Sequence, residues 1–585
     1  MGFSLVVQKK GTVEYVSFRE SYWNPEKKKY SSRTVKNFGR LDALIEKTKD
    51  KDILKKLQAQ VEALKRKSVR EKEKKIVQRV NETLAEKQGI ALSADNRTVS
   101  LGPCVYRQIW TKLNLQRKLR DMQRETDIEF DFPGAVFYMT MARSLMPDSK
   151  LAQWERRNQF LFNAKDLKLQ HLYRSLDHLD RNKDVLTTYL NHRIKSLYDR
   201  KLSVVLYDVT TYYFESQKVN GVLNFGYSKD CKFNQVQVVM GLLIDDKGIP
   251  IDYELFSGNT SEFGTMVPIL KKLKSRYKID KVIVTADRGL NSSENLRKIK
   301  ELGMDYVIAF RLRSAGKVIQ DQVFDTDGWE IATSQSIARL GIQRYKITEE
   351  TRQITVVDSK TGEKKKEPLT SKLLINYSAK RASKDASDRQ RLIDKAERYT
   401  ENPALFKSDL KRGGKSYLKV NADTLNLQLD AERIKKAAAF DGYYGIVYSD
   451  ESMTPNEVMS TYHSLWQIEE SFRISKSLLK TRPCFHWKER RIRGHFLVCF
   501  IALVIQRLLE KELEKAGLNL SAKRIAEALS EARLQELVLG EKEAYYAKSN
   551  TEGDFEAIAE ALGLGVLPRL ATGPQVKAAL KLKSL

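Results

Sequence analysis

Residues 202–208 read LSVVLYD, an apolar run that ends on the carboxylate of Asp208. A continuous apolar run of this length is typical of a strand that is buried on both faces. A second run of the same form, VIVTAD at 282–287, ends on Asp287. The two runs predict two core strands of an α/β sheet, each with an acidic residue at its end.

The neighbouring segments predict the rest of this sheet. Three further strands follow from apolar runs, and two helices follow from apolar stripes at helical spacing. The predicted strands cover 236–244, 249–256 and 306–310, and the predicted helices cover 262–278 and 292–302. The order β-β-β-α-β-α-β matches the ribonuclease H core, in which the first and fourth strands are neighbours. The predicted fold class is therefore α/β, with a ribonuclease H-like catalytic core.

Composition divides the chain into six predicted domains. They are 1–90, β pieces plus a long charged helix over about 41–88; 91–200, a basic helical DNA-binding domain; 201–312, the first part of the core; 313–440, a mostly β insertion; 441–515, the second part of the core with the catalytic helix; and 516–585, a helical region. The long helix is interpreted as a solvated surface helix, with coiled-coil dimerisation as the alternative. Helical packing explains the basic helical domain nearly as well as DNA binding does.

The charge balance points to a polyanionic partner. Lys plus Arg number 104 and Asp plus Glu number 75, which gives a formal net charge of +29. An excess of this size favours nucleic acid first. The longest apolar run, 496–505, is shorter than the roughly 20 residues of a spanning helix, so no membrane partner is expected. The N-terminus lacks a secretory pattern, and the four scattered cysteines favour a reducing, cytoplasmic setting.

Asp208 and Asp287 are the first candidate metal ligands. In the predicted sheet their carboxylates face each other, and two anions held that close repel unless a divalent cation lies between them. The alternative is that each Asp only caps a strand or a turn. For the two together, in this strand order, the metal site is the favoured interpretation.

A helix predicted from Pro455 to about residue 479 supplies the third candidate ligand, Glu469. At about 100° per residue, one polar and aromatic stripe lies beside an apolar face that would dock on the sheet. Glu469 lies where the two faces meet, whereas Glu470 is expected to turn toward solvent. A surface helix with salt bridges is the competing interpretation. The stripe comprises Tyr462, Trp466, Glu469, Arg473 and Lys476.

Three carboxylates form an oxygen-only site suited to Mg²⁺ or Mn²⁺. Two such ions about 4 Å apart would activate a water or a 3′-hydroxyl for in-line phosphoryl transfer. Tyr462, Arg473 and Lys476 would contact the flanking phosphates. Trp466 would stack on a base or simply pack.

Four other residues, Cys484, His486, His495 and Cys499, can be drawn as a zinc site. Their spacings of 2, 9 and 4 do not match common structural zinc patterns, and the last two fall in an apolar helix. Packing is the favoured interpretation of all four.

The sequence resembles DDE-type transposases of the insertion-sequence-four (IS-four) superfamily over roughly 101–495. The superfamily signature Y-x2-R-x3-E-x6-K falls on Tyr462, Glu469 and Lys476, but Leu465 stands at the Arg position, and Arg473 is suggested as its replacement. The other matching segments are DVTTYYFES (208–216), GNTSE (258–262), TADRG (285–289), DGYYGIVYSD (441–450) and RPCFHWKERRIRGH (482–495).

The resemblance implies a prokaryotic, nucleoid-associated enzyme that acts on double-stranded DNA and not on a small molecule. It would bind terminal inverted repeats as a homodimer in a synaptic complex, excise the element and join its 3′ ends to target DNA. Two alternatives remain open: a non-catalytic or domesticated DNA-binding protein such as a repressor, and a host nuclease or resolvase with the same core.

Overall fold

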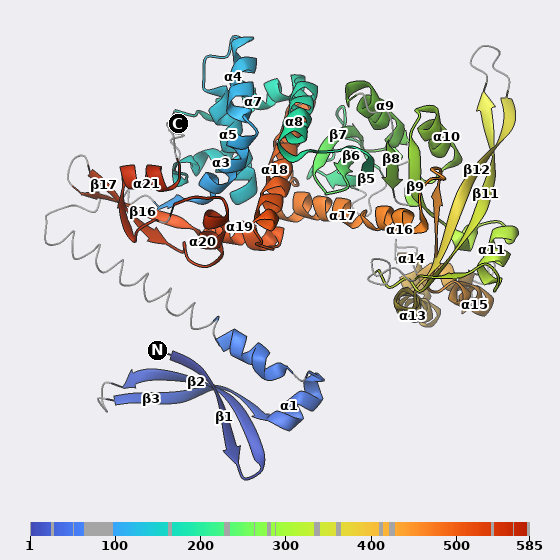
Figure 1. The fold of residues 1–585 in the computed structure, drawn as a ribbon, viewed down its shortest axis with the longest axis horizontal. Helices are drawn as coiled ribbons and strands as arrows, with labels where there is room; N and C mark the ends of the chain where they lie inside the picture. Colours follow the sequence, from blue (N-terminus) through green and yellow to red (C-terminus); the bar gives the residue numbers. More distant parts are fainter. Residues whose placement is uncertain are drawn as a thin grey trace. The chain divides into compact units, whose positions relative to one another are not determined.

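The computed structural model of the protein forms two compact units (Figure 1). Residues 1–101, 531–556 and 564–585 make up the first, and residues 102–530 and 557–563 make up the second. The described residues are 2–24, 29–50, 52–61, 63, 98–161, 166–226, 234–261, 264–277, 282–286, 288–332, 340–357, 364–408, 414–420, 427–539, 543–565 and 567–581.

The first unit contains two antiparallel sheets, in the orders β1-β2-β3 and β18-β17-β16-β4. The β-like runs near the N-terminus correspond to the first sheet. Three strands also fall within 516–585, so the expectation that this region is helical is wrong in part. The bounds are β1 Gly2–Lys10, β2 Val13–Asn24, β3 Lys29–Arg40, β4 Thr98–Ser100, β16 Arg533–Leu539, β17 Glu543–Ser549, β18 Leu570–Thr572 and α21 Gly573–Ala579.

The long N-terminal helix predicted over 41–88 is interrupted early. Helix α1 (Leu41–Thr48) ends at Lys49, whose φ of 51° lies in the left-handed region that terminates helices. A second helical stretch covers 53–61, and its Leu57 and Val61 are buried. One continuous, solvated helix is therefore wrong for this part, and the segment beyond residue 63 lies outside the described residues.

The second unit is built on a nine-stranded mixed sheet in the order β10-β11-β12-β15-β9-β8-β5-β6-β7. Strands β5, β8 and β9 pair in parallel, and the other pairs are antiparallel. The predicted order β-β-β-α-β-α-β is confirmed by the elements from β5 to β9, and β5 and β8 are neighbours as expected. Their bounds are β5 Val204–Tyr213, β6 Gln237–Asp245, β7 Pro250–Ser257, α9 Met266–Tyr277, β8 Ile283–Ala286, α10 Ser293–Glu301 and β9 Asp305–Phe310.

The two faces of this sheet are covered by different helices. On one face, Val205, Tyr207 and Val209 of β5 belong to a core that includes apolar residues of α9 and α10. Because successive strand residues point to opposite faces, Asp208 points to the other face. On that face Val458 and Met459 of α16 (Pro455–His463) pack against β9 and β15 (Tyr443–Tyr448).

The segment 313–440 is not a separate, mostly β subdomain. Its long hairpin β11–β12 extends the central sheet, because β12 pairs with β15 and β15 pairs with β9. Its longest element is a helix, α13, of 23 residues, so the segment is mixed α/β. The bounds are α11 Lys317–Phe324, β10 Glu330–Ile331, β11 Arg344–Val357, β12 Lys364–Tyr377, α13 Ala379–Glu401, α14 Pro403–Ser408, β13 Leu418–Val420, β14 Leu427–Leu429 and α15 Ala431–Ala439.

A helical part of the second unit surrounds α18 (Glu489–Lys515), which packs against α3, α5 and α7. Among the described residues, α18 is the one helix that is long and apolar enough to cross a membrane, yet 89% of its most apolar 18 residues are buried inside the protein. A helix that is buried to this extent is typical of the core of a protein. The other bounds are α3 Gly102–Lys112, α4 Leu115–Arg124, α5 Phe132–Leu145, α6 Lys150–Glu155, α7 Leu169–Arg181, α8 Lys183–Tyr198, α19 Ala522–Glu531 and α20 Asp554–Ala561.

Candidate active site

Asp208 lies in the middle of strand β5, opposite Leu242 of β6. Its side chain is partly buried, and one carboxylate oxygen accepts a hydrogen bond from the backbone N–H of Val209 at 2.7 Å. On its other side, β5 pairs in parallel with β8 up to Tyr207 and Ala286. Asp208 directly follows Tyr207 in the sequence, and Asp287 directly follows its pairing partner Ala286. Asp287 itself lies outside the described residues.

The helix that carries Glu469 is segmented. It consists of α16, of α17 (Trp466–Arg473) and of a π-helical turn over Ile474–Leu478. Backbone dihedrals stay right-handed through Ser464 and Leu465, but several backbone hydrogen bonds there, including that of Leu465 N–H to Tyr462, run from residue i to i−3. The single predicted helix is thus tightened at one point and widened at another, and π-helical turns occur frequently at functional sites.

Buried hydroxyl groups fasten the π-helical turn to the Asp208 face of β5. The Tyr212 hydroxyl lies 2.9 Å from Ser475 Oγ, which in turn lies 2.9 Å from Thr481 Oγ1. Tyr212 shares its strand face with Asp208, four residues earlier, because side chains alternate along a strand. The same face therefore carries Asp208 and holds the helix of Glu469. Strand alternation could have pointed to Tyr212 from sequence, but a π-helical turn leaves no comparable pattern.

The two neighbouring glutamates are oriented differently from the prediction. Glu469 is exposed, whereas the Glu470 side chain is only 17% exposed and pairs with Arg473. The expectation that Glu470 turns toward solvent is wrong, because its carboxylate has a cation within reach. An exposed Glu469 remains accessible to a cation and to a large substrate.

The four predicted DNA-contacting residues do not form one uniform stripe. Tyr462 packs partly buried against the core beside β9 and β15, because the tightened turn separates it from α17. Trp466 is 54% exposed, and the Arg473 side chain is 72% exposed. The Lys476 ammonium lies 5.7 Å from the centre of the Tyr212 ring, on the docked side of the π-helical turn. Trp466 and Arg473 are thus the accessible members, whereas Lys476, like Tyr462, is only partly exposed.

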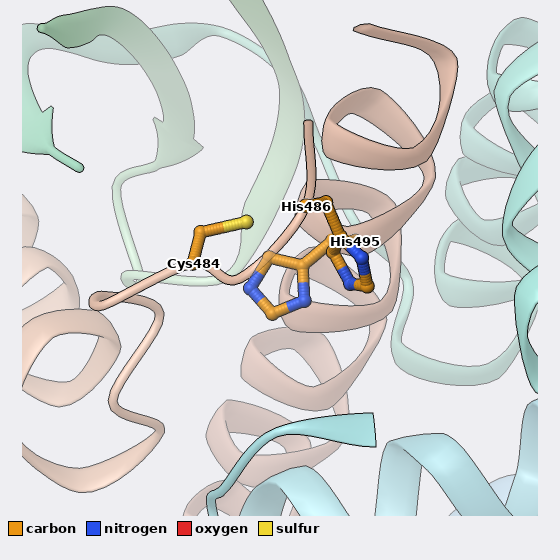
Figure 2. A group of neighbouring side chains, drawn as sticks. All are labelled: Cys484, His486 and His495. Atoms are coloured by element: carbon orange, nitrogen blue, oxygen red, sulfur yellow. The ribbon is translucent and has the colours of Figure 1, made fainter. Parts of the chain in front are cut away.

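A second cluster of possible ligands lies close by in the chain. Cys484, His486 and His495 each offer one ligand atom, and these atoms all lie within 4.8 Å of one another (Figure 2). Cys499 Sγ lies 3.6 Å from Nε2 of His495. Packing alone is therefore not the full account of these residues, because the loop that follows the π-helical turn brings three of the four possible ligands together.

These features define an α/β protein in which strand β5 carries a carboxylate on the face where the helix of Glu469 docks. Sequence comparisons identify the family. The family described as transposase DDE domain matches residues 199–505, more than half of the chain, and the chain belongs to this family. Residues 5–74 match the N-terminal domain of IS1634 family transposases. The protein is therefore a DNA transposase of the insertion-sequence type.

Other comparisons add little. A cryo-EM structure of the piggyBac transposase synaptic complex with hairpin DNA aligns with 75% of this chain and 81% of that chain, at 8% identity and a TM-score of 0.32. No curated protein matches the chain.

Proposed function

We propose that this transposase cleaves DNA at the terminal inverted repeats of its element and transfers the 3′ ends to target DNA with divalent metal ions. Asp208, Asp287 and Glu469 would be the metal ligands and the catalytic residues. The observation that carries the proposal is the position of Asp208 on the face of β5 to which the helix of Glu469 is fastened. The order and directions of β5 to β9 support a ribonuclease H-like core.

The donor set fits hard cations. Carboxylate oxygens are the ligands that Mg²⁺ and Mn²⁺ prefer, and Glu469 is exposed while Asp208 is only partly buried. Two bound ions would supply Lewis-acid activation of the attacking oxygen and stabilisation of the leaving oxygen. The protein residues hold and orient the DNA: Arg473 and Lys476 would neutralise phosphates beside the reacting bond, and Trp466 would stack on a base.

The partners that follow are terminal inverted repeats, target DNA and a second copy of the chain in a synaptic complex. Membership of the IS-four superfamily and a nucleoid-associated, cytoplasmic setting belong to the same proposal. The Y-R-E-K signature supports it at Tyr462, Glu469 and Lys476, although Leu465 replaces the Arg.

The test is cleavage of a duplex that carries the element end, with Mg²⁺. Asp208→Asn, Asp287→Asn and Glu469→Gln are expected to abolish nicking while leaving binding of the end intact. Glu470→Gln is the matched control, because it removes the neighbouring carboxylate, and it should retain nicking. Nicking at wild-type rate by any of the first three variants would refute the site. Binding without metal-dependent nicking by the wild type would indicate a repressor, and hydrolysis without joining to a second duplex would indicate a nuclease.

A further inference from the structure

The loop between the π-helical turn and α18 has a regular in-and-out pattern. Cys484 and His486 are buried, with 8% of each residue exposed, whereas Phe485 and Trp487 are 54% and 60% exposed. An extended segment places alternate side chains on opposite sides. The two possible ligands therefore point into the protein, where His495 of α18 is also buried, and the two aromatic residues point outward.

The three inward side chains converge from the loop and from the first turns of α18 (Figure 2). In a tetrahedral zinc site built from the usual Zn–S and Zn–N distances, ligand atoms lie about 3.3–3.8 Å apart. Here the three ligand atoms lie within 4.8 Å of one another. Small side-chain movements would close the remaining gap, and the backbone that carries these residues is already in place.

The hydrogen bond of His495 identifies which of its nitrogens is available. Nε2 lies 3.2 Å from the carbonyl oxygen of Thr481, and a carbonyl only accepts, so Nε2 carries the proton. Nδ1 is then unprotonated and offers a buried lone pair, and among the described residues it has no hydrogen-bond partner. A buried polar atom without a partner is costly. Histidines that bind metals characteristically donate the other ring N–H to a carbonyl or carboxylate, as His495 does.

Two basic side chains, Arg143 and Lys150, are buried near the cluster, and their positive charges would oppose the binding of a metal ion. Arg143 donates to the carbonyl oxygens of Lys480 at 3.1 Å and Asp148 at 3.0 Å, which offset its charge. Lys150 donates to Gln153 Oε1, and burial lowers the pKa of Lys150 to about 7, so it can be neutral.

We propose that Cys484, His486 and His495 bind one zinc ion that fastens the loop 479–488 to α18. One thiolate and two neutral imidazoles suit zinc, and zinc binding would displace the proton of the Cys484 thiol. The fourth position is open to water. The ion would fix the end of the helix that carries Glu469 and the outward orientation of Phe485 and Trp487.

The experiment measures metal in the full-length protein, purified under reducing conditions without chelator from cells grown with zinc. Inductively coupled plasma mass spectrometry is expected to find about one zinc ion per chain. Cys484→Ser and His495→Asn should lose most of it. Cys104→Ser is the matched control, because Cys104 is also a fully buried thiol of this unit and stands on α3. Glu469→Gln should keep its zinc, which separates this ion from any at the carboxylates.

Cobalt provides a readout that needs neither activity nor a stable variant. Replacement of zinc by Co²⁺ in the wild-type chain should give a thiolate-to-cobalt charge-transfer band and the intense visible bands of a tetrahedral site. The charge-transfer band should be absent in Cys484→Ser and retained in Cys104→Ser. A wild-type chain without zinc and without this band would overturn the proposal, as would full zinc in both ligand variants. Neither result depends on whether Asp208 and Glu469 catalyse cleavage.

Discussion

Glu469 of the proposed carboxylate site and the Cys-His cluster (Cys484, His486 and His495) lie at the two ends of one short stretch of chain, and they differ in exposure and in ligand atoms. Glu469 is exposed, whereas all three residues of the cluster are buried. Open oxygen ligands suit hard cations that must also meet DNA phosphates, and buried sulfur and nitrogen suit an ion that stays with the fold. The proposed catalytic ions and the proposed zinc ion would therefore lie on opposite sides of the π-helical turn in the sequence.

Removal of weakly held divalent ions should have the largest effect. Gel filtration into buffer without divalent ions is expected to lower the cleavage rate by about a thousandfold or more, because the attacking oxygen is no longer activated. Mg²⁺ or Mn²⁺ should restore the rate, while bound zinc stays unchanged throughout. If zinc alone restored the cleavage rate, or if zinc were lost in step with activity, the two metal sites would not be independent.

Salt should have the next largest effect, and it should act on DNA binding and not on the Cys-His cluster. With a formal net charge of +29, the chain is expected to lose about a thousandfold in affinity for duplex DNA between 50 and 200 mM salt, since each neutralised phosphate releases a counterion. Lys476→Ala should reduce the slope of log K against log salt by about one. Zinc content should not change over this range. A flat salt dependence would contradict a DNA-binding role for the basic surface.

Buried hydroxyl groups dock the π-helical turn, which lies between Glu469 and the Cys-His cluster in the sequence. Ser475→Ala leaves the buried hydroxyl groups of Tyr212 and Thr481 short of a partner, so about 1–3 kcal/mol of unfolding free energy should be lost. Urea denaturation measures this loss. Ser477→Ala is the control on the same turn, because Ser477 is exposed, and its effect should stay within about 0.5 kcal/mol. Equal losses in both variants would show that the network does not hold the helix.

The strands of the core could be predicted from sequence because they are short, continuous apolar runs with unambiguous turns. The neighbouring positions of β5 and β8 followed from the match between the predicted order of elements and the ribonuclease H core. The hairpin β11–β12 could not be assigned to the same sheet, because its pairing with β15 joins residues far apart in the chain and leaves no local pattern. The orientation of Glu470 was missed because an ion pair with Arg473 changes which side chain is covered.

The Cys-His cluster was discounted for a related reason. Sequence spacing describes metal sites built on a tight turn or a single helix, whereas these ligands come from an extended loop and a helix. Only the tertiary path of the loop brings them together. The roles of Asp208, Asp287 and Glu469 remain predictions that the cleavage variants address.

The smallest expected effect concerns the ion pair between Glu470 and Arg473. Its Arg side chain is 72% exposed, so the pair contributes little to stability, about 0.5 kcal/mol or less. Glu470→Gln frees Arg473 to meet a phosphate, and affinity for the element end should rise about twofold to threefold at low salt, in line with the modest strength of exposed pairs. Arg473→Ala should instead weaken binding and reduce the salt slope by about one. Titration of both variants against a labelled end measures the difference. Identical affinities would mean that Arg473 serves only its neighbour on α17, and Lys476 would then be the remaining cation of this segment proposed to contact phosphate.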